Sequence, residues 1–375
     1  MYPRGRGFDL KDLLVAHLRQ FLAVFWTILL PAVYGLFGGL AAVAFQRAVS
    51  IVFSMLWEIP SQQMRPGSFT VFSLATILVT SIIAGFILTF VSREAAGSGI
   101  PQVKVAYWKD FGFMPAKVVI AKFVASVLSI GGGCSLGREG PTVHIAGALA
   151  SNIAGWFGVA KKERRPALLC GAAAGLAAAF NTPLSGIAFV FEQIREDVKD
   201  GRFLAQVLIA SASATVVCHT FLGENPAFVI PPVSPVSGLP YPLVIPIAGL
   251  AALAGVGFQK STLAWRAEIK RSQRVPPFLK GAVGAVINWV LGIAVFFWIA
   301  KIGVFGLGYG DLESMLGGGI TGSQATILLI AKLAATTAVY AWGGPGGIFS
   351  PTLFFGAANR GCFQRSIWTG GQPAA

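Results

Sequence analysis

Apolar residues fill most of the chain in stretches of 11 to 25 residues, separated by short breaks rich in glycine, proline and basic side chains. The stretches cover residues 21–45, 69–91, 118–130, 141–157, 167–191, 203–222, 242–258, 282–299, 326–341 and 348–358. A helix needs about 20 apolar residues to cross the hydrocarbon core of a bilayer, so several stretches are too short to span it. Short helices that end at such breaks survive at membrane depth only where protein or a watery cavity covers them. The pattern therefore predicts an all-α polytopic membrane protein with discontinuous helices.

The composition agrees with a lipid environment. Of the 375 residues, 55% are hydrophobic and only 12% are charged, whereas an ordinary soluble domain carries about 25% charged residues. So few charged side chains cannot cover the surface of a soluble protein of this length. The 46 glycines fit membrane helices that approach one another closely.

The formal net charge of +14 is also typical of nucleic-acid-binding proteins, but its distribution favours a membrane protein. The basic residues gather in short polar breaks, as positive loops on the cytoplasmic side do. These residues are Arg4, Arg6, Lys11 and Arg19, then Lys161, Lys162, Arg164 and Arg165, then those of segment 260–280. We therefore expect a cytoplasmic N-terminus, an amphipathic helix over residues 8–22 on the membrane surface, and no nucleic-acid partner.

The sequence contains no recognisable catalytic or metal-binding motif. The four cysteines and three histidines are isolated, with no spacing that suits a metal. A nucleophile elbow, a phosphate-binding Walker loop and an HExxH pair are all missing from it. We expect no enzymatic activity, no metal and no cofactor.

An internal repeat is visible at an offset of 210 residues. Segment 122–148 aligns with segment 332–358 without a gap, so that Lys122 meets Lys332 and Gly137 meets Gly347. One residue out of register, the Gly-Ser-Gly of 97–99 meets the Gly-Tyr-Gly of 308–310. Duplicated halves with matched broken helices are typical of transporters whose substrate site lies at the repeat interface near the membrane midplane.

The repeat divides the chain into four expected parts. Residues 1–20 form the cytoplasmic amphipathic segment, and residues 21–222 form the first membrane repeat. Residues 223–358 form a second, incomplete membrane repeat, and residues 359–375 form a divergent C-terminal tail.

Three Gly- and Pro-containing breaks, at residues 97–101, 137–141 and 347–351, each predict the start of a helix. Glycine frees the backbone before the helix, and proline is tolerated in its first turn. The unpaired N–H groups of that turn and the positive end of the helix dipole form a ready anion site. Converging helix starts would therefore bind a small anion through backbone amides and the hydroxyl of Ser98.

Glu139 stands in the second break, where a carboxylate in an apolar segment is costly and marks a functional candidate. At a helix N-terminus its charged form competes with an anion for the same donors, so protonation or displacement would move it aside. We therefore predict that Glu139 is a gate, and a helix cap paired with Arg138 is the alternative. Lys122 either adds positive potential to the anion site or snorkels to the membrane interface. His144 receives no role.

The three breaks, read as GSGIP, GREGP and GGIFSP, and the stretch GAAAGLAAAFNTPLSGIAFVFE at 171–192 resemble the CLC family of chloride channels and chloride/proton antiporters. The resemblance implies a homodimer in which each subunit has its own chloride pore and an inverted repeat. It also implies a location in a bacterial inner or plasma membrane. The implied anion site uses Ser98, Gly99, Ile348 and Phe349 on the anion, Glu139 as the gating glutamate, and Lys122 and Gly140 as support.

Two departures from the family pattern bear on the mechanism. In the antiporters a second glutamate serves as the inner proton-transfer residue, and here the pair reads Glu192-Gln193. Gln193 cannot carry a proton, which favours a passive channel. Exchange by another proton route stays open, with Glu192 as a substitute.

The second departure concerns the end of the chain. The family continues for several helices after the third break, with part of the dimer surface and a tyrosine that closes the anion site from the cytoplasmic side. Polar residues instead follow residue 358. We therefore expect a C-terminally truncated member, and a non-conducting membrane fragment is the alternative of another class.

Overall fold

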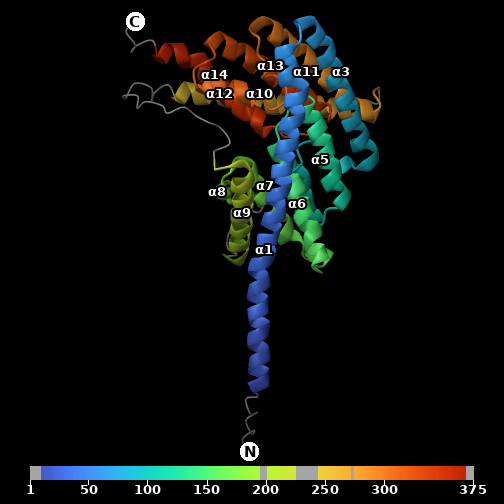
Figure 1. The fold of residues 1–375 in the computed structure, drawn as a ribbon, viewed down its shortest axis with the longest axis vertical. Helices are drawn as coiled ribbons and strands as arrows, with labels where there is room; N and C mark the ends of the chain where they lie inside the picture. The colour runs from blue at the N-terminus through green and yellow to red at the C-terminus, as the bar shows by residue number, and fades with distance from the viewer. Residues whose placement is uncertain (1–9, 195–200, 225–243, 272–273, 369–375) are drawn as a thin grey trace, which may run out of the picture.

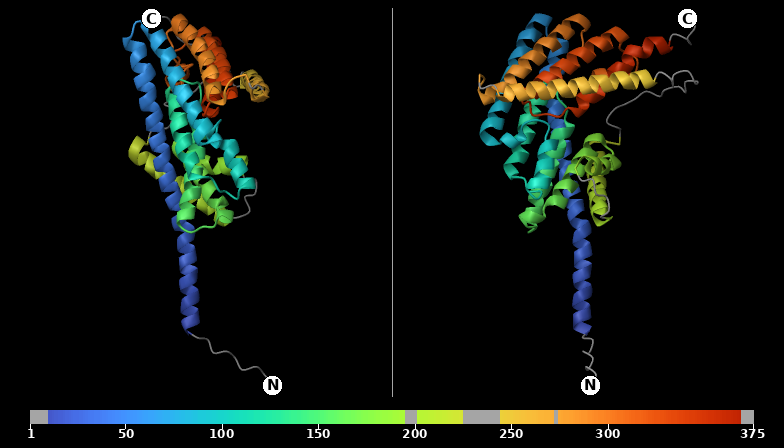
Figure 2. Two further views of the ribbon diagram at one scale, coloured as in Figure 1. Left: turned by 90° about the vertical axis from the view of Figure 1, so that its right-hand side faces the viewer. Right: turned by 180° about the vertical axis from the view of Figure 1, so that it is seen from behind.

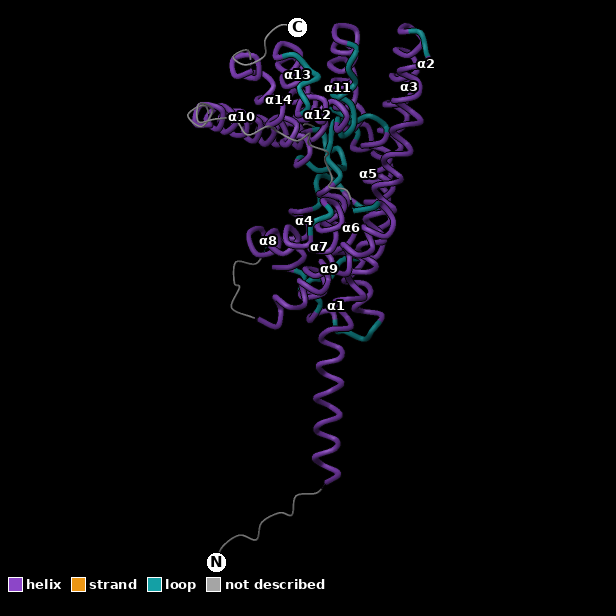
Figure 3. Tube along the Cα trace, turned by 60° about the vertical axis from the view of Figure 1, so that its left-hand side comes forward, coloured by secondary structure: helices purple, strands orange, loops and turns teal. Residues whose placement is uncertain are grey.

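Helices form nearly all of the described part of the chain in the computed structural model, which covers residues 10–194, 201–224, 244–271 and 274–368 (Figures 1 and 3). The first helices are α1 (Leu10–Phe53), η1 (Ser54–Glu58), α2 (Ile59–Gln63), α3 (Pro66–Phe86), η2 (Ile87–Val91), η3 (Arg93–Ala95), α4 (Ile100–Lys109), α5 (Ala116–Gly131) and α6 (Glu139–Trp156). They are followed by η4 (Lys161–Glu163), α7 (Arg165–Phe180), α8 (Pro183–Gln193), α9 (Gly201–Leu222), α10 (Val244–Arg271), α11 (Pro277–Ile299), α12 (Tyr309–Leu316), α13 (Gly322–Ala341) and α14 (Phe349–Trp368). The predicted all-α class is confirmed.

Helices of two lengths are present, as the apolar stretches predicted. Within the described residues, five helical segments are long and apolar enough to cross a membrane: Trp26–Gln63, Pro66–Val91, Gly201–Leu222, Pro277–Ile299 and Gly322–Ala341. Arg165–Phe180 and Phe349–Ala358 are apolar but shorter. Large apolar side chains such as Val71, Ile120 and Leu253 are exposed on the outer faces of their helices, which suits contact with lipid.

The start of α1 corrects one expectation. A separate amphipathic helix was expected over residues 8–22, but residues from Leu10 onward belong to one continuous helix that runs to Phe53. In Figure 1 the first part of this helix, in dark blue, extends beyond the other helices. Neither a glycine nor a proline stands between residues 10 and 30, so the sequence holds no residue that ends a helix there.

Two further boundaries differ from the sequence pattern. The apolar stretch 167–191 is two helices, α7 and α8, because Asn181 adopts a left-handed conformation (φ 58°) and Pro183 opens the next helix. The tail expected from residue 359 begins inside α14, which continues to Trp368. Arg360, Gln364 and Arg365 are good helix formers, so their polarity does not stop the helix. Residues 369–375 lie outside the described part.

The repeat is visible in the packing of the helices. α3 packs on α5 and α4 on α6 in the first half, and α11 packs on α13 and α12 on α14 in the second half. α5 with α6 and α13 with α14 form a further matched pair, and α3 and α11 meet across the two halves. Figure 2 shows the orange helices of the second half beside the blue and cyan helices of the first. The duplicated arrangement agrees with the predicted inverted repeat, while the exact domain boundaries stay predictions.

α6 lies at the centre of the first half and buries nearly all of its side chains. It packs against α1, α4, α5 and α7. Small residues allow this close packing: a Cβ atom at Gly171 of α7 would lie 2.4 Å from the carbonyl oxygen of Ala146. The N-terminus of α6 is therefore held rigidly inside the protein.

Candidate anion site

The three predicted helix starts are confirmed. α4 begins at Ile100, α6 at Glu139 and α14 at Phe349, each within its Gly- and Pro-containing break. The loop before α4 needs glycine, because Gly97 and Gly99 adopt φ values of 72° and 99° in a region that other residues rarely enter. The sequence thus encodes these starts locally.

The starts of α6 and α14 are joined by backbone hydrogen bonds. The N–H of Gly137 donates to the carbonyl of Gly347 (2.6 Å), and the N–H of Gly347 donates to the carbonyl of Gly137 (2.7 Å). These two residues are repeat counterparts, so the repeats meet at equivalent positions. The start of α4 lies against the same place, because a Cβ atom at Gly140 would come within 2.6 Å of the Ser98 carbonyl oxygen. All three starts therefore converge.

Glu139 lies at this convergence and is 1% exposed. Its Oε1 atom accepts hydrogen bonds from the Tyr309 hydroxyl (2.6 Å) and from the Ser350 hydroxyl. Its Oε2 atom is also buried and has no hydrogen-bond partner among the described residues. The alternative of a helix cap paired with Arg138 has no ion pair to support it: the Arg138 guanidinium instead lies over the Tyr309 ring, 5.1 Å from its centroid.

Sequence reasoning missed Tyr309 and Ser350 as neighbours of Glu139. They lie 170 and 211 residues from it along the chain, and each hydroxyl also contacts the other (2.9 Å). The repeat offered the one usable signal, because it aligned Tyr309 with Ser98 and Ser350 with Gly140. The short helix α12 begins at Tyr309 and contains no apolar stretch, so the apolar pattern did not predict it.

Lys122 and its counterpart Lys332 have matching environments. Both are 0% exposed, which excludes the snorkelling alternative for Lys122. The Lys122 ammonium donates to the carbonyls of Ala95 (3.0 Å) and Gly97, in the loop that carries Ser98. The Lys332 ammonium donates to the carbonyls of Gly303 (2.9 Å), Val304 (3.3 Å) and Gly306 (2.8 Å), in the loop before α12. Each lysine therefore fixes the loop in front of a helix start.

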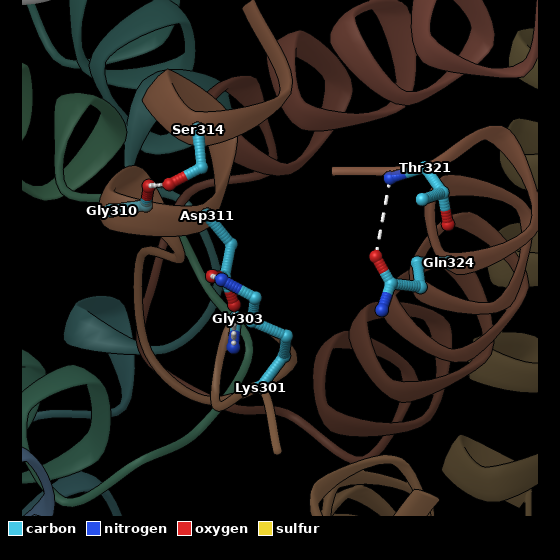
Figure 4. Close-up of polar contacts among 7 residues, drawn as sticks. All are labelled: Lys301, Gly303, Gly310, Asp311, Ser314, Thr321 and Gln324. Atoms are coloured by element: carbon cyan, nitrogen blue, oxygen red, sulfur yellow. Dashed lines mark hydrogen bonds and ion pairs between the residues drawn. The ribbon is translucent and has the colours of Figure 1, made fainter. Parts of the chain in front are cut away.

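The loop before α12 has a second support. Asp311 accepts a hydrogen bond from the Gly303 N–H (2.8 Å) and pairs with Lys301 (3.3 Å). Figure 4 shows this cluster, together with the Ser314 hydroxyl on the Gly310 carbonyl within α12. The same view shows the Thr321 N–H on the Gln324 side chain at the start of α13. Contacts from Lys332 and from Asp311 therefore fix the loop that leads to Tyr309.

The other predicted anion contacts lie around the same place. Ser98 is 6% exposed, and Gly99 packs against His144, whose Cβ would be 2.5 Å from an added Cβ. Ile348 packs into the core cluster around Phe45 and Trp57. The Phe349 ring is 46% exposed and stands edge-on to Phe180, with ring centroids 5.2 Å apart. Binding of an anion by these residues stays a prediction.

The proton-pathway positions lie elsewhere. Glu192 and Gln193 are the last two residues of α8, and both side chains are exposed. In Figure 1, α8 lies apart from α12 and α14. A role of Glu192 in place of Gln193 also stays a prediction.

This fold and site define a class of protein: a membrane protein built as an inverted repeat with discontinuous helices that meet at a buried carboxylate. Residues 80–369 match the family described as voltage gated chloride channel. The match covers more than half of the chain, so the chain belongs to this family. The resemblance drawn from the sequence is confirmed, and membership in a family of channels and transporters confirms that the chain is not an enzyme.

Curated relatives agree with this assignment. The chain is 30% identical over 357 residues to the H(+)/Cl(-) exchange transporter ClcA of Vibrio cholerae serotype O1. The aligned region covers 92% of this chain and 74% of the relative. It is 31% identical over 341 residues to the protein of that name from Salmonella arizonae, covering 88% of this chain and 70% of the relative.

Solved structures share the fold. A slow cyanobacterial Cl-/H+ antiporter has a TM-score of 0.73 and 23% identity, covering 88% of this chain and 76% of its own. A CLC-type fluoride/proton antiporter has a TM-score of 0.71 and 19% identity, covering 88% of this chain and 79% of its own.

Proposed function

We propose that this protein carries chloride across a membrane through a pathway gated by Glu139. The observation that carries the proposal is a buried carboxylate at the first position of α6, where the orphan N–H groups and the helix dipole favour an anion. Family membership and the activity printed for the ClcA relatives support chloride as the ion.

The gate works by competition for one place. While Glu139 is charged, its carboxylate occupies the position that suits an anion and blocks the pathway. A proton removes the charge, or an incoming chloride displaces the carboxylate, and the side chain moves aside. Acid therefore favours the open state, and chloride flux rises as the pH falls.

The remaining predicted residues complete the pathway. The backbone of Gly99, the Ser98 hydroxyl and the N–H groups that open α14 at Ile348 and Phe349 would contact the anion. The absence of a full positive charge from this contact shell keeps binding weak enough for release. Lys122 and Gly140 would support the site by fixing its loop and by admitting the close approach of Ser98.

Passive movement of chloride is the mechanism we propose, because Gln193 cannot accept a proton at the inner position. Proton-coupled exchange by another route is the second candidate, which the names of the ClcA relatives favour. The protein reconstituted in liposomes distinguishes them. An outward chloride gradient that drives protons uphill, measured with a pH electrode, would contradict the passive mechanism, and absence of any chloride flux would contradict transport itself and favour a non-conducting fragment.

The gate has its own test. We expect Glu139→Gln to make chloride flux nearly independent of external pH, because the amide holds no charge to neutralise. Flux is measured with a chloride electrode at pH values from 4.5 to 7.5 in a buffer series. A variant that keeps the full pH dependence of the wild type would place the gate elsewhere.

We also propose a bacterial inner or plasma membrane location, with the N-terminus in the cytoplasm, and a homodimer. The basic residues of η4 and of the end of α10 support this orientation. A cysteine introduced at the exposed Lys162 should react with a membrane-impermeant maleimide only after the cells are opened. Reaction in intact cells would reverse the orientation, and a single-subunit mass in detergent by light scattering would contradict the dimer.

A further inference from the structure

Tyr309 and Ser350 join the second repeat directly to the carboxylate of the first. Its hydroxyl donates to Glu139 Oε1 at 2.6 Å and lies 2.9 Å from the Ser350 hydroxyl, which donates to the same oxygen. We call Tyr309 and Ser350 the hydroxyl clamp. The clamp holds one carboxylate oxygen through two donors, while the other oxygen is buried and has no hydrogen-bond partner within the part of the chain that the structure describes.

The clamp belongs to the second repeat alone, for a steric reason. The counterpart of Ser350 is Gly140, and a Cβ atom there would lie 2.6 Å from the Ser98 carbonyl oxygen. The first repeat therefore has no room for a second hydroxyl at this position. The counterpart of Tyr309 is Ser98, whose shorter side chain replaces the phenol.

Tyr309 also lines a hollow of the protein whose lining does not include Glu139. A cavity of about 240 Å³ is lined by residues of α1, η1, the loop before α12 and the first turn of α12, and by Arg138, with Phe53, Glu58, Tyr309 and Asp311 among them. Tyr309 lines this cavity with one part and binds Glu139 with its hydroxyl. Tyr309 therefore connects this cavity to the carboxylate of Glu139.

We propose that Tyr309, with Ser350, is a positioning residue that holds the charged form of Glu139 in the anion place and so sets the pH at which the pathway opens. The inference rests on the proposed function, in which Glu139 is the gate. Hydroxyl donors stabilise a carboxylate more than a neutral carboxyl group, since hydrogen bonds to charged groups are the stronger ones. Loss of a donor therefore makes both protonation and displacement by chloride easier.

The other titratable groups near the start of α6 are not changed by a substitution in the clamp. The titratable side chains on α6 and on the elements near its start are Arg138 directly before it, His144 of α6, Lys122 of α5, Lys332 of α13, Asp311 of α12 and Glu58 of η1. A substitution that removes only the phenolic hydroxyl keeps this electrostatic environment. The change in pH dependence then reports the hydrogen bond.

The test compares Tyr309→Phe with the wild type in liposomes with equal pH on both sides. We expect chloride flux at neutral pH to increase, and the pH of half-maximal flux to rise by about one to two units, the equivalent of one hydrogen bond to a charged group. In detergent, we expect chloride to bind at least about tenfold more tightly at pH 7.5 by calorimetry, because the competing carboxylate is held less firmly. Ser350→Ala should shift both quantities in the same direction.

Two controls make the readout specific. In the Glu139→Gln background, Tyr309→Phe should cause no further shift, because no carboxylate remains to be held. Tyr107→Phe alters another buried tyrosine, which packs beside Trp108 and beneath Arg165. Its chloride flux should depend on pH in the same way as that of the wild type.

The outcomes separate the inference from the proposed function. If Tyr309→Phe and Ser350→Ala both keep the wild-type pH curve and chloride affinity while Glu139→Gln is pH-independent, the clamp is overturned and the gate stands. If Glu139→Gln keeps its pH dependence, the gate itself fails and the clamp with it. Should Tyr309→Phe not fold, as judged by size-exclusion chromatography, the Ser350→Ala curve alone decides.

Discussion

The starts of α6 and α14 occupy equivalent places in the two repeats, yet only α6 begins with a carboxylate. Its counterpart in α14 is the apolar Phe349. At the next position the polar residue is in the other repeat: Gly140 of α6 has no side chain, whereas the Ser350 hydroxyl of α14 donates a hydrogen bond to Glu139. One repeat thus supplies the acceptor and the other supplies the donors. The comparison teaches that duplication gave a common backbone frame, on which the two halves became chemically complementary.

The two buried lysines are also repeat counterparts, and they differ in the number of contacts that they make. Lys122 donates to two carbonyls and Lys332 to three, and Lys332 also lies 5.4 Å from the centroid of the Phe354 ring. Both fix a loop before a helix start. The loop that leads to Tyr309 therefore receives more hydrogen bonds from its lysine than the loop that carries Ser98.

The largest effect on stability should come from removing these lysines. We expect Lys332→Met to lower the unfolding temperature more than Lys122→Met, because each buried carbonyl left without a donor costs about 1–3 kcal/mol and Lys332 leaves one more. Thermal unfolding in detergent, followed by tryptophan fluorescence, measures both. An equal loss in the two variants would remove the difference that the contacts indicate.

A smaller effect on stability is expected at Gly140, where the start of α6 leaves no room for a side chain. Gly140→Ala should destabilise the protein by about 1–3 kcal/mol through overpacking against Ser98, and should lower chloride flux. Gly356→Ala in α14 is the matched control, since an added Cβ there meets nothing within 4 Å, and alanine favours a helix by about 1 kcal/mol over glycine. If Gly140→Ala and Gly356→Ala have the same stability, the close approach of Ser98 is not the reason that position 140 requires glycine.

The smallest effect concerns a pair of counterpart hydroxyls. Thr336 shares a hydrogen bond of 2.8 Å with Ser135, whereas its counterpart Ser126 has a buried hydroxyl with no partner in the described part of the chain. We expect Thr336→Val to cost about 1 kcal/mol and Ser126→Ala to be neutral or slightly stabilising. Chemical denaturation of the two variants beside the wild type gives both values, and a stable Thr336→Val would show that the hydroxyl pair contributes nothing.

The sequence predicted the features that depend on neighbouring residues. Glycine and proline at 97–101, 137–141 and 347–351 act within one turn of the helix that they begin, so the three starts could be located. The 210-residue offset exposed the repeat because Lys332 and Gly347 kept the identities of Lys122 and Gly137. Family motifs then named Glu139 without any structure.

The features that were missed depend on tertiary packing. Tyr309 reaches Glu139 across 170 residues of sequence, from a loop held by Lys332 and Asp311, and no local pattern encodes that approach. The structure brings Tyr309, from the second repeat, to the buried carboxylate of Glu139. The division of 167–191 was missed for a simpler reason: apolar residues on both sides of Asn181 hid a break of two residues.

The backbone bonds between Gly137 and Gly347 have a mechanical consequence. Each glycine both gives and accepts a bond, so the two repeats cannot move apart at this point without losing both. Separation of the starts of α6 and α14 at this point would therefore break both hydrogen bonds. Under the proposed function, the pathway would then open by movement of the Glu139 side chain rather than by separation of the two helix starts.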